Sequence, residues 1–175
     1  MQVHDRLFIG GEWVEPATSA TIDVVSPSTL ETVGRVPEGT EVDVDRAVAA
    51  AREAFDTGPW PRMTAQERGA VLEGISAGIT ARMDDVTRLI SSEMGSPYSW
   101  AMMGQVLSTT MVADYYVGLA KEYAFTEERP GTFGSALVKK HPVGVAGAIV
   151  PWNVPMFVTM LKLAPAFVAG CTVVL

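Results

Sequence analysis

Apolar side chains recur every three or four residues over most of the first 123 positions, which predicts several amphipathic helices. Thr40–Asp43 and Thr64–Glu67 have the pattern of helix capping boxes, and Gly95 followed by Pro97 marks a helix end. Helices are therefore expected after each capping box, before Gly95, and over roughly 98–123. The apolar faces of the first three predicted helices are formed by Val44, Ala47, Val48, Ala51 and Phe55; by Val71, Leu72, Ile75 and Ile79; and by Val86, Leu89, Ile90 and Met94.

The long fourth helix has a methionine-rich apolar stripe, for which two interpretations compete. Its members are Trp100, Met103, Leu107, Met111, Tyr115 and Leu119. Such a stripe packs in a core or contacts a ligand, and the spacing favours core packing.

Short strands are predicted before and after these helices. Leu7–Val14 is typical of two strands that meet at a Gly-Gly turn, and Thr21–Val25 is a further strand candidate. Residues 125–134 contain Pro130-Gly131 and several charges, and are expected to form a loop or a connecting arm. Ala136–Lys140 resembles an exposed edge strand, or an arm that pairs with another subunit.

The last part of the chain is the most apolar, and its pattern predicts a strand–helix–strand unit. Val143–Val150 is expected to be a buried strand, and Pro155–Leu163 a helix with a break or new start at Pro165. Cys171–Leu175 begins another buried strand. Because the sequence stops inside that apolar run, we expect these residues to be the front part of a longer protein.

Composition narrows the possible functions of the 175 residues. With 48% hydrophobic residues the chain can bury a core, and a net charge of −7 without a basic stripe disfavours nucleic acid as a partner. The single cysteine, Cys171, excludes an internal disulfide and fits a reducing compartment such as the cytoplasm. His4 and His141 have no ligand partners at metal-site spacing.

A membrane span is an alternative for residues 142–161, which contain no charged side chain. Three prolines and Asn153 in this window would leave backbone groups without hydrogen bonds in lipid. A buried α/β strand and its following helix explain the same composition better.

The turn "IVPWNVP" between the predicted strand and helix is the best candidate for chemistry. Ligands of open α/β sheets bind at the carboxyl ends of strands, where this turn lies. A G-x-G-x-x-G phosphate loop is absent. Asn153 can donate its amide to an oxyanion, or it can simply cap the next helix. The local pattern alone favours the cap.

A series of motifs occurs in the order that one enzyme family shows: "FIGGEW", "VVSPST", "VDRAVAAAREAF", "PWPRMTAQERG", "EMGSP", "HPVGVAGAIVPWNVP" and "LAPAFVAGCTVVL". On these motifs the chain resembles the N-terminal part of the NAD(P)-dependent aldehyde dehydrogenase superfamily. The resemblance implies an incomplete α/β, Rossmann-like cofactor-binding domain. Residues 1–124 would be its N-terminal hairpin and helices, 125–142 a strand-like oligomerisation arm, and 143–175 the first, truncated βαβ unit, with the catalytic domain outside the chain.

The resemblance also implies roles for individual residues. The cofactor, NAD or NADP, would lie against Ile149, Val150, Pro151, Trp152 and Asn153. Asn153 would stabilise the oxyanion, and the arm would pair subunits into a homodimer or homotetramer. A tunnel for a small-molecule aldehyde would be lined by Val154, Val158 and Leu161, close to the long helix at Gly104 and Ser108. A monovalent-cation site at Val25 and Glu93 is a weaker implication.

The family's nucleophilic cysteine and general-base glutamate match positions beyond Leu175. The implied reaction oxidises an aldehyde to a carboxylic acid through a cysteine thiohemiacetal, so residues 1–175 alone are expected to be inactive. Cys171 begins a buried strand, where an apolar setting raises a thiol's pKa, and is interpreted as structural. The alternative is a non-catalytic α/β module that binds a nucleotide or a partner subunit. A CoA-acylating or semialdehyde-specific relative also remains open, as do the aldehyde and the choice between NAD and NADP.

Overall fold

The computed structural model describes residues 2–175, and its first two helices begin where the capping patterns indicate, while the third ends at Gly95 as expected. They are α1 (Glu41–Asp56), α2 (Ala65–Ala81) and α3 (Met83–Met94). At α2, Glu67 Oε2 accepts the backbone N–H of Thr64 at 2.7 Å, and the Thr64 hydroxyl accepts the N–H of Glu67 at 3.2 Å. This reciprocal pair confirms the predicted capping box.

The long fourth helix is present but is wound in three parts. It consists of α4 (Tyr98–Trp100), the π-helical segment η2 (Ala101–Leu107) and α5 (Ser108–Glu122). Side-chain hydroxyls bond to the backbone carbonyls of η2: Ser108 donates to Met103 O at 2.8 Å and Thr109 to Gln105 O at 2.5 Å. Single π turns are inserted into α-helices most often at functional sites.

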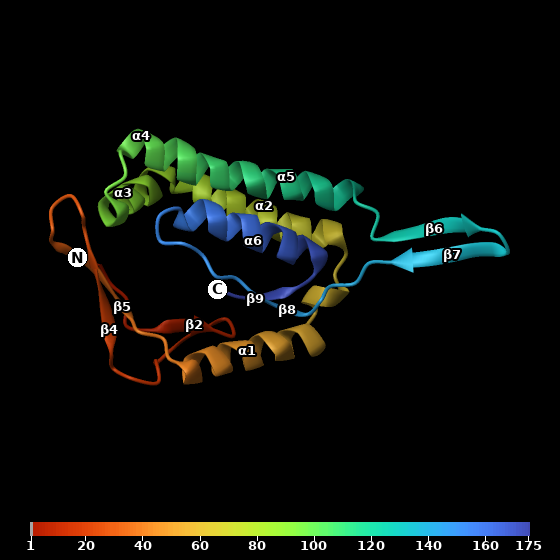
Figure 1. Cartoon of the computed structure of the whole chain (residues 1–175), viewed down its shortest axis with the longest axis horizontal. Helices are drawn as coiled ribbons and strands as arrows, with labels where there is room; N and C mark the ends of the chain where they lie inside the picture. The colour runs from red at the N-terminus through yellow and green to blue at the C-terminus, as the bar shows by residue number, and fades with distance from the viewer. Residues whose placement is uncertain (1) are drawn as a thin grey trace.

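The helical core lies where α2, α5 and α6 (Pro155–Ala169) pack side by side, as Figure 1 shows. Close approach of α2 and α5 depends on small residues, since a Cβ on Gly69 would lie 3.0 Å from the Ala120 Cβ. The buried members of this core are Leu72, Ala113, Val117, Ala120, Met160, Ala164 and Val168.

Core packing is wrong as an account of the methionine-rich stripe. Trp100, Met103, Met111 and Tyr115 are exposed, whereas the face of the same helix that carries Ala113 is buried. The physical reason is that the alanines and threonines of that face let α5 approach α2 and α6 closely, while the larger apolar side chains do not fit there.

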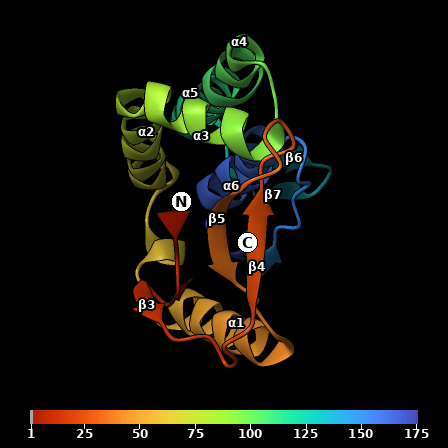
Figure 2. The ribbon, with the colours of Figure 1, turned by 90° about the vertical axis from the view of Figure 1, so that its left-hand side faces the viewer.

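The N-terminal strands form a hairpin and a separate small sheet. The predicted hairpin is confirmed as β2 (Leu7–Ile9) paired antiparallel with β3 (Glu12–Val14). The predicted strand at 21–25 is β4 (Thr21–Val25). It pairs antiparallel with β5 (Thr32–Pro37), and β1 (Gln2–Val3) joins β5 on its other side. Figure 2 shows β4 and β5 lying between the α3 end and the α1 end of the molecule.

Residues 125–134, expected to form a loop or a connecting arm, are half of a long hairpin. β6 (Thr126–Gly131) pairs antiparallel with β7 (Gly134–Lys139) in full register, and the two strands project away from the helices in Figure 1. Pro130 is tolerated because a two-stranded ribbon has only edge strands. The tip residue Phe133 is fully exposed.

The C-terminal unit is the predicted βαβ unit: β8 (Val145–Gly147) and β9 (Thr172–Val174) are parallel and are connected through α6. Two details differ. The strand expected over 143–150 is only three residues long, because β9 is its one partner among residues 2–175. The helix continues through Pro165 to Ala169, since a proline removes a single helix hydrogen bond while its neighbours stay buried in the core.

The first turn of α1 is held by Asp43, a buried carboxylate that accepts hydrogen bonds from four donor groups, the fourth being the Arg46 guanidinium. It accepts the backbone N–H and the hydroxyl of Thr40 at 3.0 and 2.9 Å, and the N–H of Ala17 at 2.9 Å. Arg46 Nη1 lies 3.2 Å away. These partners, led by the Thr40 backbone bond, hold the pKa of Asp43 below its ordinary value.

We expect Asp43→Asn to lower the Tm at neutral pH, because the charged acceptor is lost. A lowered folded-state pKa stabilises the fold above the unfolded pKa, about 3.9, and that contribution disappears as pH falls through the folded value. The Tm difference between wild type and variant should therefore shrink in acid. Asp45→Asn removes the same charge from an exposed position of α1 and is the control. A pH-independent difference would contradict the prediction.

Candidate functional site

The turn between β8 and α6 is an exposed ledge at the carboxyl end of β8. The last sheet hydrogen bond runs from Ala148 N–H to Val174 O at 2.8 Å, after which the chain leaves the sheet. Ile149 is 90% exposed and Trp152 is 82% exposed, and Asn153 is exposed beside them. An apolar, accessible surface therefore lies at the sheet edge where α/β proteins bind ligands.

Asn153 does not cap α6, which corrects the interpretation that the local pattern favoured. The N-cap of α6 is Val154, and no side chain caps the helix. The side-chain amide of Asn153 makes no hydrogen bond within residues 2–175, whereas its backbone carbonyl accepts from Gln105 Nε2 at 3.4 Å. Asn153 lies one position before the N-cap, and Pro155, whose fixed φ suits the first helical position, starts the helix after Val154.

The predicted tunnel residues are only partly brought together. A cavity of about 380 Å³ joins Leu161 of α6 to Ser108 of the long helix. Val154 and Val158 are half-buried and do not line it, and Gly104 lies under the indole of Trp100 instead. The remaining lining residues are Met111, Val112, Tyr115, Tyr116 and Phe157. Met111 and Tyr115 belong to the methionine-rich stripe of the long helix, for which the spacing favoured core packing over contact with a ligand. Their position in this cavity fits contact with a ligand better.

The cation candidates Val25 and Glu93 lie near the turn that follows β4. The end of α3 packs on this turn, since a Cβ on Gly95 would lie 2.7 Å from Pro27 Cγ. Withdrawal from water raises the pKa of Glu93, with His4 opposing the shift. Within residues 2–175 no cluster of three or more His, Cys, Asp or Glu side chains is positioned to hold a metal ion. The cation site stays a prediction.

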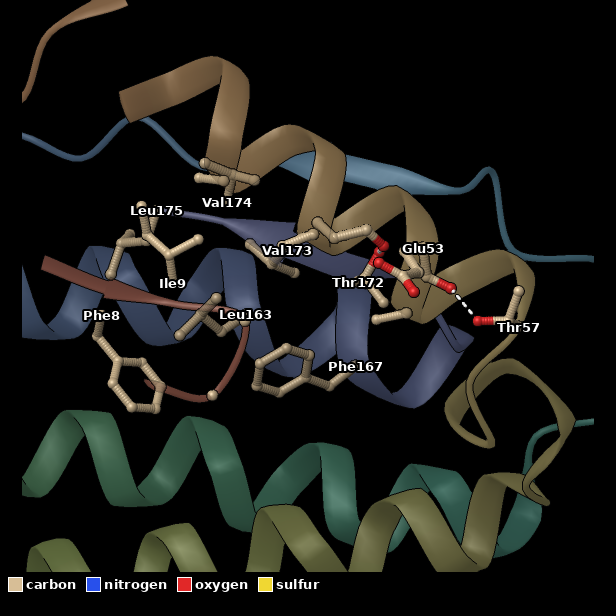
Figure 3. A pocket seen from close by; sticks show the side chains of 16 residues that line it. Phe8, Ile9, Glu53, Thr57, Leu163, Phe167, Thr172, Val173, Val174 and Leu175 are labelled. Carbon is tan, nitrogen blue, oxygen red and sulfur yellow. Dashed lines mark hydrogen bonds between the residues drawn. The ribbon is translucent and has the colours of Figure 1, made fainter. Parts of the chain in front are cut away.

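A second cavity, larger than the one beside Leu161, lies elsewhere and is mostly apolar. It measures about 910 Å³ and lies between the β2–β3 hairpin, α1, α6 and β9, as the side chains in Figure 3 show. Phe8, Leu163 and Phe167 contribute much of its wall, and Glu53 is the one charged residue that lines it. Such a lining lacks the cations and helix N-termini that bind phosphate, so this cavity is a poor candidate for the cofactor's diphosphate.

Cys171 has the structural setting that the sequence indicates. The residue is buried and is not part of a disulfide. Its carbonyl accepts the indole N–H of Trp60 at 3.0 Å, and its N–H bonds to Ala166 O at 2.9 Å. No helix in the described part of the chain, residues 2–175, is long and apolar enough to cross a membrane.

A parallel βαβ unit with an exposed turn at its carboxyl edge, packed against helices and preceded in the chain by a long hairpin, defines part of an α/β domain. The chain belongs to the aldehyde dehydrogenase family, whose family model matches residues 13–175. This match confirms the resemblance and the α/β fold class.

Three relatives illustrate the similarity. The geranial dehydrogenase of Castellaniella defragrans is 37% identical over 172 residues, which are 98% of this chain and 36% of that protein. A Mycobacterium tuberculosis aldehyde dehydrogenase complexed with NAD+ has a TM-score of 0.95 at 44% identity, covering 98% of this chain and 36% of that one. A Pseudomonas syringae aldehyde dehydrogenase mutant with NAD+ and octanal has a TM-score of 0.90 at 37% identity, covering 97% and 34%. The chain thus spans about a third of the length of the relatives it matches.

Proposed function

We propose that the full-length protein oxidises an aldehyde to a carboxylic acid with NAD(P)+. The observation that carries this proposal is the exposed Ile149–Asn153 turn at the carboxyl end of β8, in a chain that belongs to the aldehyde dehydrogenase family. The solved relatives from M. tuberculosis and P. syringae bind NAD+, and the latter also holds octanal.

The turn fits the nicotinamide-ribose side of such a cofactor. Ile149, Val150, Pro151, Trp152 and Asn153 would hold it, and the exposure of Ile149 and Trp152 leaves their apolar surfaces free for contact with a flat ring. Pro151 has no N–H and a fixed φ, which restricts the backbone of the ledge at that position. When bound, NAD(P)+ supplies a hydride acceptor.

Asn153 would act on the oxygen of the aldehyde. The thiolate of a cysteine outside residues 1–175 adds to the carbonyl carbon, and the carbonyl π electrons move onto oxygen. The Asn153 amide donates a hydrogen bond to that oxyanion without transferring a proton. The hydride that leaves this carbon would pass to bound NAD(P)+, and water deprotonated by a glutamate elsewhere in the protein would add to the resulting thioester and release the acid and the cysteine thiolate.

The substrate is proposed to be an aldehyde with an apolar chain. The cavity that joins Ser108 to Leu161 is lined by apolar and aromatic side chains. Val154 and Val158, on the same end of α6, would extend its wall toward Asn153. Desolvation of such a chain favours binding without a charged partner in the cavity.

The β6–β7 hairpin is proposed to pair subunits into a homodimer or homotetramer. Its strands project from the helices, and Phe133 and Leu137 are exposed apolar side chains on it. An uncovered two-stranded ribbon with such side chains favours pairing with another strand. The single cysteine, buried and free, supports a location in the cytoplasm.

The proposal is tested by adding straight-chain aldehydes of increasing length to purified full-length protein with NAD+ or NADP+. We expect aldehyde-dependent formation of the reduced cofactor and of an equal amount of carboxylic acid. Residues 1–175 alone are the matched control and should be inactive. Cofactor binding without any aldehyde-dependent reduction would favour the non-catalytic module instead.

A further inference from the structure

Gln105 is a fully buried amide in η2, and half of the amide has no partner. Its side chain is 0% exposed, and Oε1 has no hydrogen-bond donor among residues 2–175. Ala101 and Val106 of the same segment belong to an apolar cluster with Ile90. Burying an incompletely bonded amide costs free energy, so packing alone does not account for a glutamine at this position.

The other half of the amide faces the turn that carries Asn153. Nε2 lies 3.4 Å from Asn153 O and 3.3 Å from Met94 Sδ. Both neighbours are acceptors, so the NH₂ group must face them. Within residues 2–175 this is the only hydrogen bond made by any backbone group from Ile149 to Asn153.

That single bond acts where the turn is otherwise free to move. Pro151 and Pro155 fix their own φ angles and restrict the residues before them. Trp152 and Asn153 lie between these constraints, and their side chains are exposed. A hydrogen bond to the Asn153 carbonyl therefore restrains the one part of the turn that the prolines leave unrestrained.

The π-helical winding helps to place this glutamine. Gln105 lies inside η2, and Thr109 donates to its carbonyl. The methionines Met103 and Met111 are exposed, so they lie on the side of this helix opposite to Gln105 and Val106. η2 thus presents a polar side chain to the interior, next to the turn that carries Asn153. Insertions of a π turn into an α-helix are frequent at functional sites.

We propose that Gln105 is a positioning residue for the reaction: by holding the Asn153 carbonyl it sets the direction of the Asn153 side-chain amide. The inference rests on the proposed function. A positioning role and a stability role predict different effects of an apolar side chain of similar size at position 105. For a positioning role, this replacement removes an unpartnered amide from the core and does not lower stability, but it releases the turn and lowers turnover.

The test compares Gln105→Leu and Gln105→Met with Val106→Ala in the full-length protein. For both glutamine variants we expect kcat to fall by about 10- to 100-fold while Tm is unchanged or higher. Val106 is equally buried in η2, and its side chain has no group that can hydrogen-bond to the Asn153 carbonyl. Val106→Ala should therefore lower Tm and leave the kcat of the folded protein unchanged.

A double-mutant cycle with Asn153→Ala separates positioning from a general effect on the protein. If Gln105 acts through Asn153, Gln105→Leu should change kcat by less than about twofold in the Asn153→Ala background. An equal fold-loss in both backgrounds, or a wild-type kcat for Gln105→Leu alone, would overturn the role of Gln105 only. A wild-type protein that oxidises no aldehyde would instead overturn the proposed function, and the role of Gln105 with it.

Discussion

We expect Asn153→Ala to lower kcat for aldehyde oxidation by about 10²–10³ while the protein stays folded. The loss is large because the amide would bond to the oxygen only as negative charge develops on it, so its contribution belongs to the transition state. Stability should change little, since the Asn153 side chain is exposed and makes no hydrogen bond within residues 2–175.

Steady-state kinetics and a thermal melt of the full-length protein check this prediction together. Asn153→Asp is the matched variant, because it keeps the size of the side chain but replaces the donor with a negative charge that repels an oxyanion. It should be at least as impaired as the alanine variant. Intact turnover in the alanine variant would contradict the oxyanion role, and a lowered stability would then assign Asn153 a structural role only.

The secondary structure that the sequence predicted correctly is the part controlled by short-range chemistry. Thr64 and Glu67 are three residues apart, and that spacing is sufficient to form the reciprocal bonds that start α2. Gly95 adopts the left-handed conformation, φ 67°, that ends α3. The Gly10-Gly11 turn between β2 and β3 is of the same local kind.

The missed strands depend on partners that are distant in sequence or on an unusual strand composition. β5 contains Gly34 and Pro37 and is recognisable only from its pairing with β4 and β1. β6 contains Pro130-Gly131, which usually marks a loop, but the matched register of β7 compensates for its low strand propensity. Only the β1–β5 pairing joins residues far apart in the sequence, whereas β4 and β5, and β6 and β7, are neighbours along the chain.

The apolar periodicity of the long helix predicted the wrong buried face. Periodicity shows which apolar residues share a helix face, but it does not show which face packs against other helices. Met103 and Met111 repeat as a core stripe would, but Ala113 and Ala120 make the contact with the other helices. The inserted π turn also changes the angular position of all residues that follow it.

The candidate site was predictable in position and not in its supporting contacts. A strand followed by Pro151-Trp152-Asn153 places the turn at a sheet edge, whatever the rest of the chain does. The contact between Gln105 and Asn153 joins residues 48 positions apart, and a glutamine inside an apolar repeat gives no sign of it. Supporting residues of this kind are found only when burial and hydrogen bonding are known.

The opposite end of α6 is held by Arg68, a buried arginine that bonds to backbone carbonyls. Nε and Nη2 donate to Val168 O at 3.0 and 2.8 Å, and Nη1 donates to Met63 O. The side chain is 5% exposed, and it forms no ion pair with any residue between 2 and 175. Burial lowers the pKa of Arg68, with Cys171 and Glu67 opposing the shift. The guanidinium is instead stabilised by the negative end of the helix dipole.

We expect Arg68→Met to destabilise the full-length protein by about 3 kcal/mol, because two carbonyls in a buried setting lose charged donors at once. Arg82→Met is the control: Arg82 is exposed and its side chain makes no hydrogen bond within residues 2–175, so the free energy of unfolding should change by less than about 0.5 kcal/mol.

Gly170→Ala should destabilise the protein as Arg68→Met does, because φ is +94° at this position and a Cβ would lie 3.2 Å from the Arg68 guanidinium carbon. Urea denaturation of the three variants measures these changes in stability, and equal midpoints for Arg68→Met and Arg82→Met would contradict the anchoring role of Arg68.

The loss of this anchor should also affect turnover, since α6 begins directly after the Asn153 turn. We expect Asn153 to occupy a wider range of positions, so kcat should fall more in Arg68→Met than in Arg82→Met.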